Sequence, residues 1–570
     1  MIWYFENLER FRLEREALDA LAAEAPRLQI IKWRVDDEFR LIVEADIQHS
    51  EVTWPVSLRF PNHFPYSPPV VLPRGDATRW SNHQYGPGGE LCLEYGPDNW
   101  EQSITGRMML ESAQRLLSGE SPSADGTDGE VASRHALSLG QTLRGSVRRF
   151  VLTWPAHEHL ELVPEGASIA GEANLLFHDE ALLYGAMSWG ASAAWIDPSF
   201  PAPLRFEGLN RSSHFFRLPS DAEWPGAETP EEFRAGLRAI ADADIVDDSL
   251  ILLRRQGIYR AYALWSDRVS QVEVIRARAP GGRLDGDHPS LASRRIAIVG
   301  CGSLGSKVAV SLARSGVGKF LLVDDDVLLP ENLVRHELDW REVGTHKSSS
   351  VGRRIQLVNP AADVTARQHR LGGQEASGGV EALIKSLSEV DLIIDASATP
   401  EVFNYLCAAS AIGKKPMIWA EVYGGGIGGL VVRHRPGVEP EPALMRRVIE
   451  NWCAEQGLPI ERDERGYETE RGEVPAVADD ADVSVIAAHA ARFAVDVLIP
   501  RDPSIFPHAA YFVGLAPGWM FSQPFETHPV PMPPPPPKGA SAKLDEAEAS
   551  EERNRIAKLF EALGNGTTAA

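Results

Sequence analysis

Short runs of apolar residues alternate with amphipathic stretches near the amino terminus of the chain. In residues 5–24 the apolar positions recur at roughly helical spacing, which predicts a helix. Apolar, strand-like segments follow at 28–35, 39–47 and 53–60. The next stretch, FPNHFPYSPPVVLP, is so rich in proline that it must be extended or turning, and a second helical pattern follows at 104–117. We therefore predict an α+β domain over residues 1–120.

Changes in composition divide the rest of the chain. Gly, Ser, Asp and Glu dominate residues 121–142, which is the composition of a linker. Residues 143–282 mix strand and helix periods, which predicts an α/β middle domain, and residues 290–526 predict a further α/β domain. The tail, 527–570, begins with the proline run PVPMPPPPPK, a polyproline II spacer, and a helical pattern follows it at 543–563.

Length and charge exclude several classes of protein. A chain of 570 residues predicts several domains, and the net charge of −23 argues against nucleic-acid binding, which depends on Lys and Arg. No run approaches the ~20 apolar residues of a membrane span, and the amino terminus lacks the apolar core of a signal peptide. Four cysteines without a CxxC pair exclude a disulfide framework and a zinc knuckle. We expect a cytoplasmic protein that binds neither membrane nor nucleic acid.

A glycine-rich turn between an apolar run and a helical pattern predicts a phosphate-binding loop. The apolar run 296–299 reads as a buried strand, and Gly300, Gly302 and Gly305 follow it directly. In this pattern the first glycine allows a tight turn, the second lets the backbone approach a phosphate, and the third lets helix pack on strand. The amino terminus of the helix then presents N–H groups to an anion. A second strand ends at Asp324, whose carboxylate can accept hydrogen bonds from ribose hydroxyls.

The residues that follow this loop favour a triphosphate over a hydride-transfer cofactor. Asp326, Asn332, Arg335 and Lys347 supply charges and donors that a site handling pyrophosphate needs. The order DDD…ENLVRH…GTHK resembles the adenylating domain of ubiquitin-activating-type enzymes and of their bacterial, ThiF-type sulfur-carrier relatives. The resemblance implies a Rossmann-like fold and ATP as cofactor. The residues that it assigns to nucleotide binding are Gly300, Gly302, Gly305, Asp324, Asp326, Asn332, Arg335 and Lys347.

The metal-binding position of this family is altered. Relatives place a magnesium-binding aspartate three residues beyond a strand-end aspartate, and here that position is Ala398. The strand-end residue, Asp395, remains. Because open α/β sheets bind ligands at the carboxyl ends of their strands, we expect Asp395 to hold Mg²⁺ itself.

The amino-terminal domain carries a candidate acceptor thiol. Its FPYSPPVV and LCLEYGPDNW segments resemble the ubiquitin-conjugating fold, which implies that Cys92 accepts an acyl group as a thioester. The His-Pro-Asn triplet of that family is replaced by Asn82, His83 and Gln84. The amide of Asn82 or Gln84 is a candidate donor to the oxyanion, and His83 is a candidate for proton transfer.

A second thiol lies where some adenylating domains carry a thioester cysteine. Cys453 is the only cysteine of the polar segment 436–482. Arg446 and Arg447 favour its thiolate, whereas Glu450 opposes it. Two interpretations stay open, a first thioester carrier or a structural thiol buried in a helix.

A conjugating-type domain ahead of an adenylating domain resembles the bacterial conjugating–activating fusions of antiphage CBASS operons. The resemblance implies that a protein carboxyl terminus, that of a cGAS-like nucleotidyltransferase, is adenylated, passed through thioesters and ligated to a target, and that the enzyme is a homodimer. Two alternatives remain, activation of a separate ubiquitin-like modifier and a non-catalytic assembly platform. The middle domain is then a structural or docking module or a degenerate adenylating-like domain.

Overall fold

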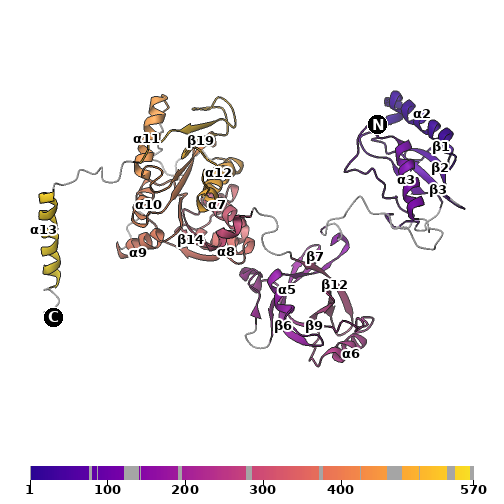
Figure 1. Ribbon diagram of the computed structural model, residues 1–570, viewed down its shortest axis with the longest axis horizontal. Helices are drawn as coiled ribbons and strands as arrows, with labels where there is room; N and C mark the ends of the chain where they lie inside the picture. Colours follow the sequence, from indigo (N-terminus) through magenta and orange to yellow (C-terminus); the bar gives the residue numbers. More distant parts are fainter. Residues whose placement is uncertain are drawn as a thin grey trace. The chain divides into compact units, whose positions relative to one another are not determined.

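The computed structural model describes residues 2–535, apart from 50, 76–79, 82, 87, 121–139, 141–142, 191–194, 278–285, 372–376, 424, 459–477 and 500, together with residues 546–564. The chain divides into two compact units, Met1–Gly145 and Ser146–Ala570 (Figure 1). The predicted linker, 121–142, lies outside the described residues except for residue 140.

The amino-terminal unit is built on an antiparallel sheet whose strands lie in sequence order. These strands are β1(Leu28–Val35), β2(Leu41–His49), β3(Val52–Arg59) and β4(Val70–Pro73). The helices are α1(Trp3–Glu6), α2(Leu8–Glu24) and α3(Gly106–Glu120). Leu18 and Leu21 of α2 and Leu110 of α3 are buried with Val43 and Val56 of the sheet in one hydrophobic cluster. The elements follow the order that the sequence predicts.

The middle region is a β-barrel, which corrects the predicted α/β domain. Its strands are β5(Arg148–Leu152), β6(Ser168–His178), β7(Ala181–Trp189), β8(Trp195–Ile196), β9(Leu209–Arg217), β10(Ser249–Arg255), β11(Ile258–Leu264) and β12(Val269–Arg276). They are ordered β5-β12-β11-β10-β9-β6-β7-β8, and β5 also pairs with β7. The sheet therefore closes on itself, and Figure 1 shows the resulting ring. The region also contains η1(Leu143–Gly145), α5(Trp154–Leu160), η2(Ala202–Phe206) and α6(Pro230–Ile240).

Strand β10 shows why the pattern of apolar residues did not predict the barrel. Leu250 and Leu252 pack into one hydrophobic cluster, whereas Ile251 and Leu253 pack into another, which includes Phe233 of α6. A strand covered on both faces is a continuous apolar run and loses the alternation that marks a half-exposed strand.

The third region contains the Rossmann-like α/β sheet that the sequence predicts, but its last strand lies beyond residue 526, the predicted end of this domain, and within the predicted tail. Its strands are β13(Arg295–Val299), β14(Lys319–Val323), β15(Asp363–Arg367), β16(Leu392–Asp395), β17(Met417–Tyr423), β18(Gly428–His434), β19(Ala510–Gly514) and β20(Thr527–Val530). They are ordered β15-β14-β13-β16-β17-β18-β19-β20, parallel from β15 to β17 and antiparallel beyond. The strand order reverses between β13 and β16, and sheets of this kind bind ligands at such a point, beyond the carboxyl ends of the strands.

Helices cover both faces of this sheet (Figure 1). They are η3(His288–Ser293), α7(Ser303–Arg314), η4(Pro330–Val334), η5(Trp340–Glu342), α8(Lys347–Val358), α9(Ser377–Ser388), α10(Pro400–Gly413), α11(Pro442–Glu455) and α12(Asp480–Leu498). Residues of α7 and α12 share a hydrophobic cluster with one face of the sheet, and residues of α10 and α11 share a cluster with the other.

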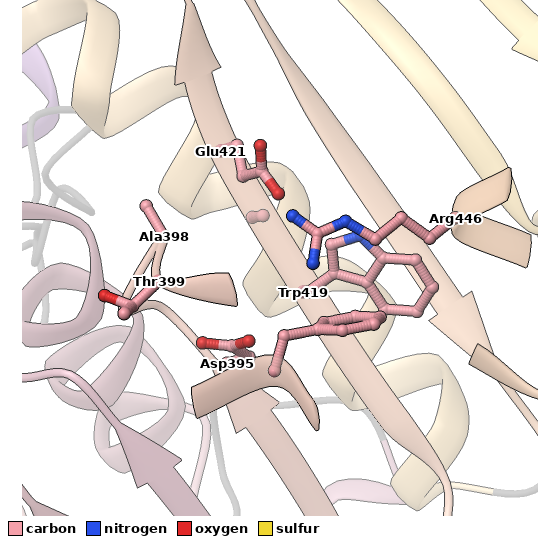
Figure 2. A pocket seen from close by; sticks show the side chains of 8 residues that line it. Asp395, Ala398, Thr399, Trp419, Glu421 and Arg446 are labelled. Carbon is pink, nitrogen blue, oxygen red and sulfur yellow. The ribbon is translucent and has the colours of Figure 1, made fainter. Parts of the chain in front are cut away.

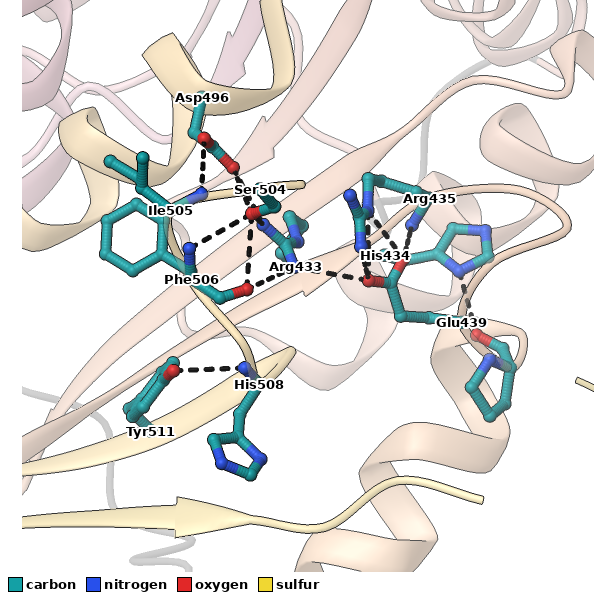
Figure 3. Close-up of polar contacts among 11 residues, drawn as sticks. Arg433, His434, Arg435, Glu439, Asp496, Ser504, Ile505, Phe506, His508 and Tyr511 are labelled. Atoms are coloured by element: carbon teal, nitrogen blue, oxygen red, sulfur yellow. Dashed lines mark hydrogen bonds and ion pairs between the residues drawn. The ribbon is translucent and has the colours of Figure 1, made fainter. Parts of the chain in front are cut away.

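A buried ion network joins β18 to the end of α12 (Figure 3). The side chain of Arg433 is 1% exposed, and it donates hydrogen bonds to Asp496 at 3.0 Å and to the Ser504 hydroxyl at 2.8 Å. Glu439 lies 3.4 Å from its other terminal nitrogen. Because both carboxylates contact the guanidinium, its charge is compensated inside the core, as a buried ion requires. This network has a structural role and does not belong to the site described below.

The carboxyl-terminal tail contains a helix, α13(Glu546–Gly564). Across the described helices, none combines the length and the apolar composition that crossing a membrane requires.

Candidate functional site

Two glycines of the predicted phosphate loop are required by close backbone packing. Gly300 follows β13 with a φ of +87°, and a Cβ there would lie 2.8 Å from backbone atoms of Ala396 and Ser397. A Cβ at Gly305 would lie 1.9 Å from the carbonyl oxygen of Gly300. These two positions therefore accept only glycine if the strand, the turn and helix α7 are to keep their places.

Gly302 has no such packing reason to be glycine. Its φ of −73° suits any residue, and no atom of the described residues lies within 4 Å of where a Cβ would stand. It caps the amino terminus of α7, a helix of 12 residues. Open space beside the unpaired N–H groups of a helix start is the arrangement that binds phosphate.

The carboxylate of Asp324, which directly follows strand β14, holds the phosphate loop by hydrogen bonds. One oxygen accepts from the N–H of Cys301 at 2.6 Å, and the other accepts from the N–H of Asp326 at 2.8 Å. Burial raises the pKa of Asp324, and these two N–H donors oppose the shift. Each carboxylate oxygen has a second lone pair, so Asp324 keeps acceptor capacity for a ligand hydroxyl.

The side chain of His336 also holds the phosphate loop in place, a role that was not predicted from the sequence. Its Nδ1 accepts from the N–H of Leu338 at 3.2 Å, so the proton is on Nε2, which donates to the carbonyl of Cys301 at 2.9 Å. Burial lowers the pKa of His336 to about 4, so the ring is neutral at physiological pH. The only sequence signal was its place next to Arg335.

The other predicted nucleotide residues lie around this loop. Lys347 is the first residue of α8, and its Nζ lies 2.8 Å from a carboxylate oxygen of Asp326. Asn332 accepts from the N–H of Leu329 at 3.0 Å and so caps η4, the element that ends at Val334, just before Arg335. The structure therefore connects Asp326 to Lys347 directly and places Asn332 and Arg335 just before His336.

Asp395 lies in a pocket at the end of β16, two strands from β14 (Figure 2). One of its oxygens accepts from both the N–H and the hydroxyl of Ser397, at 3.0 and 2.7 Å. Burial raises the pKa of Asp395 to about 6. Figure 2 shows the guanidinium of Arg446 between Asp395 and Glu421, and Ala398 also lines the pocket.

These residues do not form a ready-made cage of protein ligands for a metal ion. A guanidinium already supplies the positive charge between the two carboxylates, and Ser397 occupies one oxygen of Asp395. Among the described residues, no group of three or more His, Cys, Asp or Glu side chains is placed to hold a metal. Mg²⁺ that is bound together with phosphates needs only one or two carboxylates from the protein, so Asp395 as its ligand stays a prediction. Arg446, from a helix remote in sequence, is a pocket residue that this prediction did not include.

The candidate acceptor thiol, Cys92, lies in a loop of the amino-terminal unit. It is partly exposed, and its N–H donates to the carbonyl of His83 at 2.7 Å. Burial raises the pKa of the Cys92 thiol, a hydrogen bond from Tyr85 lowers it, and the charge of Asp98 raises it. The imidazole of His83 lies 3.9 Å from a carboxylate oxygen of Glu120.

One of the two candidate oxyanion donors of the sequence is committed to other partners. Gln84 is buried, its side-chain amide donates to the carbonyl of Gly89 at 3.1 Å, and its side-chain oxygen accepts from the N–H of Trp80 at 2.8 Å. The amide of Gln84 is therefore committed to holding the loop. Asn82, the other candidate, lies outside the described residues.

Cys453 has the environment of a structural thiol, which is one of the two interpretations that the sequence left open. It lies on α11 and is fully buried in the hydrophobic cluster that contains Met445 and Ile449. Burial and the nearby Glu450 raise the pKa of Cys453 to about 11. Arg446, expected to favour its thiolate, lines the pocket of Asp395 instead.

Similarity to known proteins is concentrated in the third region. Residues 284–491 match the ThiF family. This range contains the phosphate loop, Asp324, Lys347 and Asp395. The match therefore falls on the region that holds the sheet and the loop described above.

Three curated bacterial relatives extend the picture. The chain is 28% identical over 169 residues to the ATP-dependent ubiquitin transferase-like protein Cap2 of Pseudomonas aeruginosa, a match that covers 29% of this chain and 28% of Cap2. It is 35% identical over 157 residues to the sulfur carrier protein ThiS adenylyltransferase of Escherichia coli, covering 27% and 58%. It is 43% identical over 117 residues to the uncharacterized protein y4qC of Sinorhizobium fredii, covering 20% of each chain. The matches span less than two thirds of each relative, and together they support a CBASS-like ThiF fusion.

Proposed function

We propose that the ThiF-type domain activates a protein carboxyl terminus with ATP. In this reaction a carboxylate oxygen of the protein attacks the α-phosphorus of ATP and forms an O–P bond. The bond from the α-phosphorus to the oxygen that bridges to the β-phosphate breaks, pyrophosphate departs, and the acyl-adenylate remains. The observation that carries the proposal is the open space over Gly302 at the start of α7, beside a loop fixed by Asp324 and His336. Similarity to ThiF-type adenylyltransferases supports the same reaction.

Each residue of the loop then has a part in that reaction. The N–H groups at the start of α7 bind phosphate oxygens, and Asp324 accepts from a ribose hydroxyl with its remaining lone pairs. Lys347 is paired with Asp326, and we propose that it exchanges that carboxylate for a phosphate oxygen when ATP binds. Arg335 and Lys347 stabilise the negative charge that develops on the α-phosphate and on pyrophosphate. Magnesium enters as part of the MgATP substrate.

We propose further that the acyl group passes to Cys92. The thiolate attacks the acyl carbonyl, the C–S bond forms and AMP leaves; a target amine then attacks the thioester, and the C–S bond breaks as the amide forms. The element order of the amino-terminal unit and the FPYSPPVV and LCLEYGPDNW segments support a ubiquitin-conjugating-like role for this unit. The burial of Cys453 favours direct transfer from the adenylate to Cys92 over a relay through two thiols.

We propose, from the sequence resemblance to the conjugating–activating fusions of CBASS operons, a place in antiphage defence, with a cGAS-like nucleotidyltransferase as the protein whose carboxyl terminus is activated. We propose a homodimer for the same reason. Val334 and Trp340 lie on either side of Arg335 and His336 in the sequence, and they are 67% and 71% exposed. These exposed apolar side chains suit a protein contact near the nucleotide site. Light scattering of the purified chain measures its oligomeric state.

Exchange of labelled pyrophosphate into ATP tests the adenylation step. With the matching carboxyl-terminal protein, the wild type should exchange, and Lys347→Ala should lower the rate at least about 100-fold because a cation facing the reacting phosphates is lost. Lys385→Ala, at an exposed lysine of α9, is the matched control and should leave the rate unchanged.

The outcome of this assay separates the alternatives. Exchange with a ubiquitin-like protein in place of the nucleotidyltransferase would indicate a separate modifier. No exchange with any candidate carboxyl terminus would support the assembly platform, an interpretation favoured by Ala398 and by the altered triplet at Asn82, His83 and Gln84.

A further inference from the structure

The loop that carries Cys92, between His83 and Cys92 and here called the thiol loop, is a short hairpin. Its side chains point alternately to two opposite sides. Gln84 and Leu91 form an antiparallel bridge, and the N–H of Tyr85 donates to the carbonyl of Glu90 at 2.9 Å. The N–H of Cys92 donates to the carbonyl of His83 at 2.7 Å. Because side chains alternate along paired strands, Gln84 and Leu91 share one side, and their neighbours share the other.

The two sides of this hairpin differ in burial. Gln84 and Leu91 are both 5% exposed and fix the hairpin to the core. On the other side His83 stands directly opposite Cys92, and Tyr85 stands on the diagonal, a separation that an aromatic side chain can bridge. Tyr85 is 64% exposed, and its hydroxyl interacts electrostatically with the thiol of Cys92. The hairpin register therefore brings a phenol hydroxyl to the candidate acceptor sulfur.

We propose that Tyr85 is a catalytic residue of the acceptor site, donating a hydrogen bond from its hydroxyl to the sulfur of Cys92 whenever that sulfur carries negative charge. This inference rests on the proposed thioester step. During loading the donor stabilises the attacking thiolate before the C–S bond forms and AMP departs. During transfer the target amine attacks, the C–S bond breaks, its electron pair returns to sulfur, and the hydroxyl of Tyr85 stabilises the departing thiolate. Tyr85 keeps its proton throughout, and the amine proton goes to water.

The surroundings explain why a neutral donor is useful at this sulfur. Asp98 disfavours the thiolate, Glu90 belongs to the same hairpin, and Glu120 lies near His83. The buried amide of Gln84 faces away. Tyr85 thus supplies a donor on a side of the loop where carboxylates otherwise oppose negative charge, and a low thiol pKa also makes sulfur a better leaving group.

Alkylation of the native protein with iodoacetamide tests the hydrogen bond without ATP or a partner. Peptide mass spectrometry measures the rate at Cys92 between pH 6 and 10. Tyr85→Phe removes only the hydroxyl, and we expect about tenfold slower alkylation near pH 7.5 and a pH profile displaced upward. Tyr66→Phe, at a tyrosine 75% exposed in the same unit, is the matched control and should react like wild type. Equal rates and profiles for Tyr85→Phe and wild type would overturn the proposal.

Thioester kinetics then test the catalytic use of this hydrogen bond. With ATP and the activated protein, Tyr85→Phe should slow both loading of Cys92 and discharge to an amine by about tenfold, with Tyr66→Phe unchanged. If wild-type Cys92 forms a thioester and Tyr85→Phe loads and discharges at the wild-type rates, the role of Tyr85 is overturned but the transfer step is not. No thioester on wild-type Cys92 would overturn the proposed transfer step itself, whatever the alkylation rates show.

Discussion

The phosphate loop and the thiol loop hold their chemistry in different ways. The phosphate loop is fixed at the backbone, by glycines packed against carbonyl groups and by Asp324 and His336 on either side of Cys301. The thiol loop is fixed to the core on its buried side, where Gln84 and Leu91 lie. Its chemistry lies in side chains on the open side. Substitutions at the packed glycines of the phosphate loop should therefore lower the stability of the fold. Substitutions on the open side of the thiol loop should change the reactivity of the thiol and leave the stability nearly unchanged.

The largest effect is expected at Cys92. Cys92→Ala should abolish the reducible adduct formed with ATP and the activated protein, a loss of at least about 100-fold, while leaving thermal unfolding nearly unchanged. Cys453→Ala should keep loading within about twofold and cost about 1 kcal/mol of stability, because it empties part of a packed cluster. Non-reducing gels measure the adduct and calorimetry the stability. If Cys453→Ala fails to load Cys92 although it is folded, Cys453 is the first carrier after all.

In the phosphate loop, two glycines three residues apart should respond in opposite ways. Gly305→Ala should lower the free energy of unfolding by about 3 kcal/mol, because its Cβ would overlap the carbonyl of Gly300. Gly302→Ala should stay within about 0.5 kcal/mol of wild type, because its Cβ meets open space, yet it should weaken ATP binding about tenfold. Urea denaturation and isothermal titration with ATP measure the two effects. Tight ATP binding by Gly302→Ala would mean that phosphate does not occupy that space.

The smallest expected effect concerns pH and His336. Its pKa of about 4 in the folded protein lies below its ordinary value of 6.5, so the unfolded chain takes up the proton first. The stability due to neutral His336 is therefore complete above pH 6.5 and is lost as the pH falls to about 4, with about 2 kcal/mol gone at pH 5. His336→Gln stays uncharged and retains a donor for Cys301. Its urea-denaturation stability should fall by about 2 kcal/mol less than that of wild type between pH 7.5 and pH 5.

A His336→Gln variant with the wild-type pH dependence would show that His336 is not the titrating group. The control is His49→Gln, which alters the partly buried last residue of β2 in the other unit and should leave that pH dependence as it is in wild type.

Backbone constraints could be predicted from the sequence, whereas side-chain positions set by tertiary pairing could not. The strand, the turn and the helix of the phosphate loop could be predicted because Gly300 and Gly305 meet local packing demands of the turn. The closure of the barrel was not, because it depends on pairing between β5 and β12, whose paired residues Arg149 and Glu273 are far apart in sequence. The position of Arg446 beside Asp395 depends in the same way on how α11 packs on the sheet.

One part of the site carried a signal that the sequence interpretation did not use. Met445, Ile449 and Cys453 recur every fourth position, and all three are buried on one side of α11. That spacing is the mark of a core-facing helix stripe and favours the structural interpretation of Cys453. At Tyr85 no comparable signal exists, because its approach to Cys92 depends on the register of the hairpin.

The closed barrel also has a consequence for the order in which the chain is made. Its first strand, β5, pairs with its last, β12, so a nascent chain cannot complete the barrel until residue 276 has left the ribosome. At 5–20 residues per second, roughly 6–25 s pass between synthesis of the two strands, and β5 lacks its β12 partner for that time. A fragment meant to fold alone must therefore begin before residue 148 and end after residue 276, because any cut between them leaves a strand edge open to pairing with another chain.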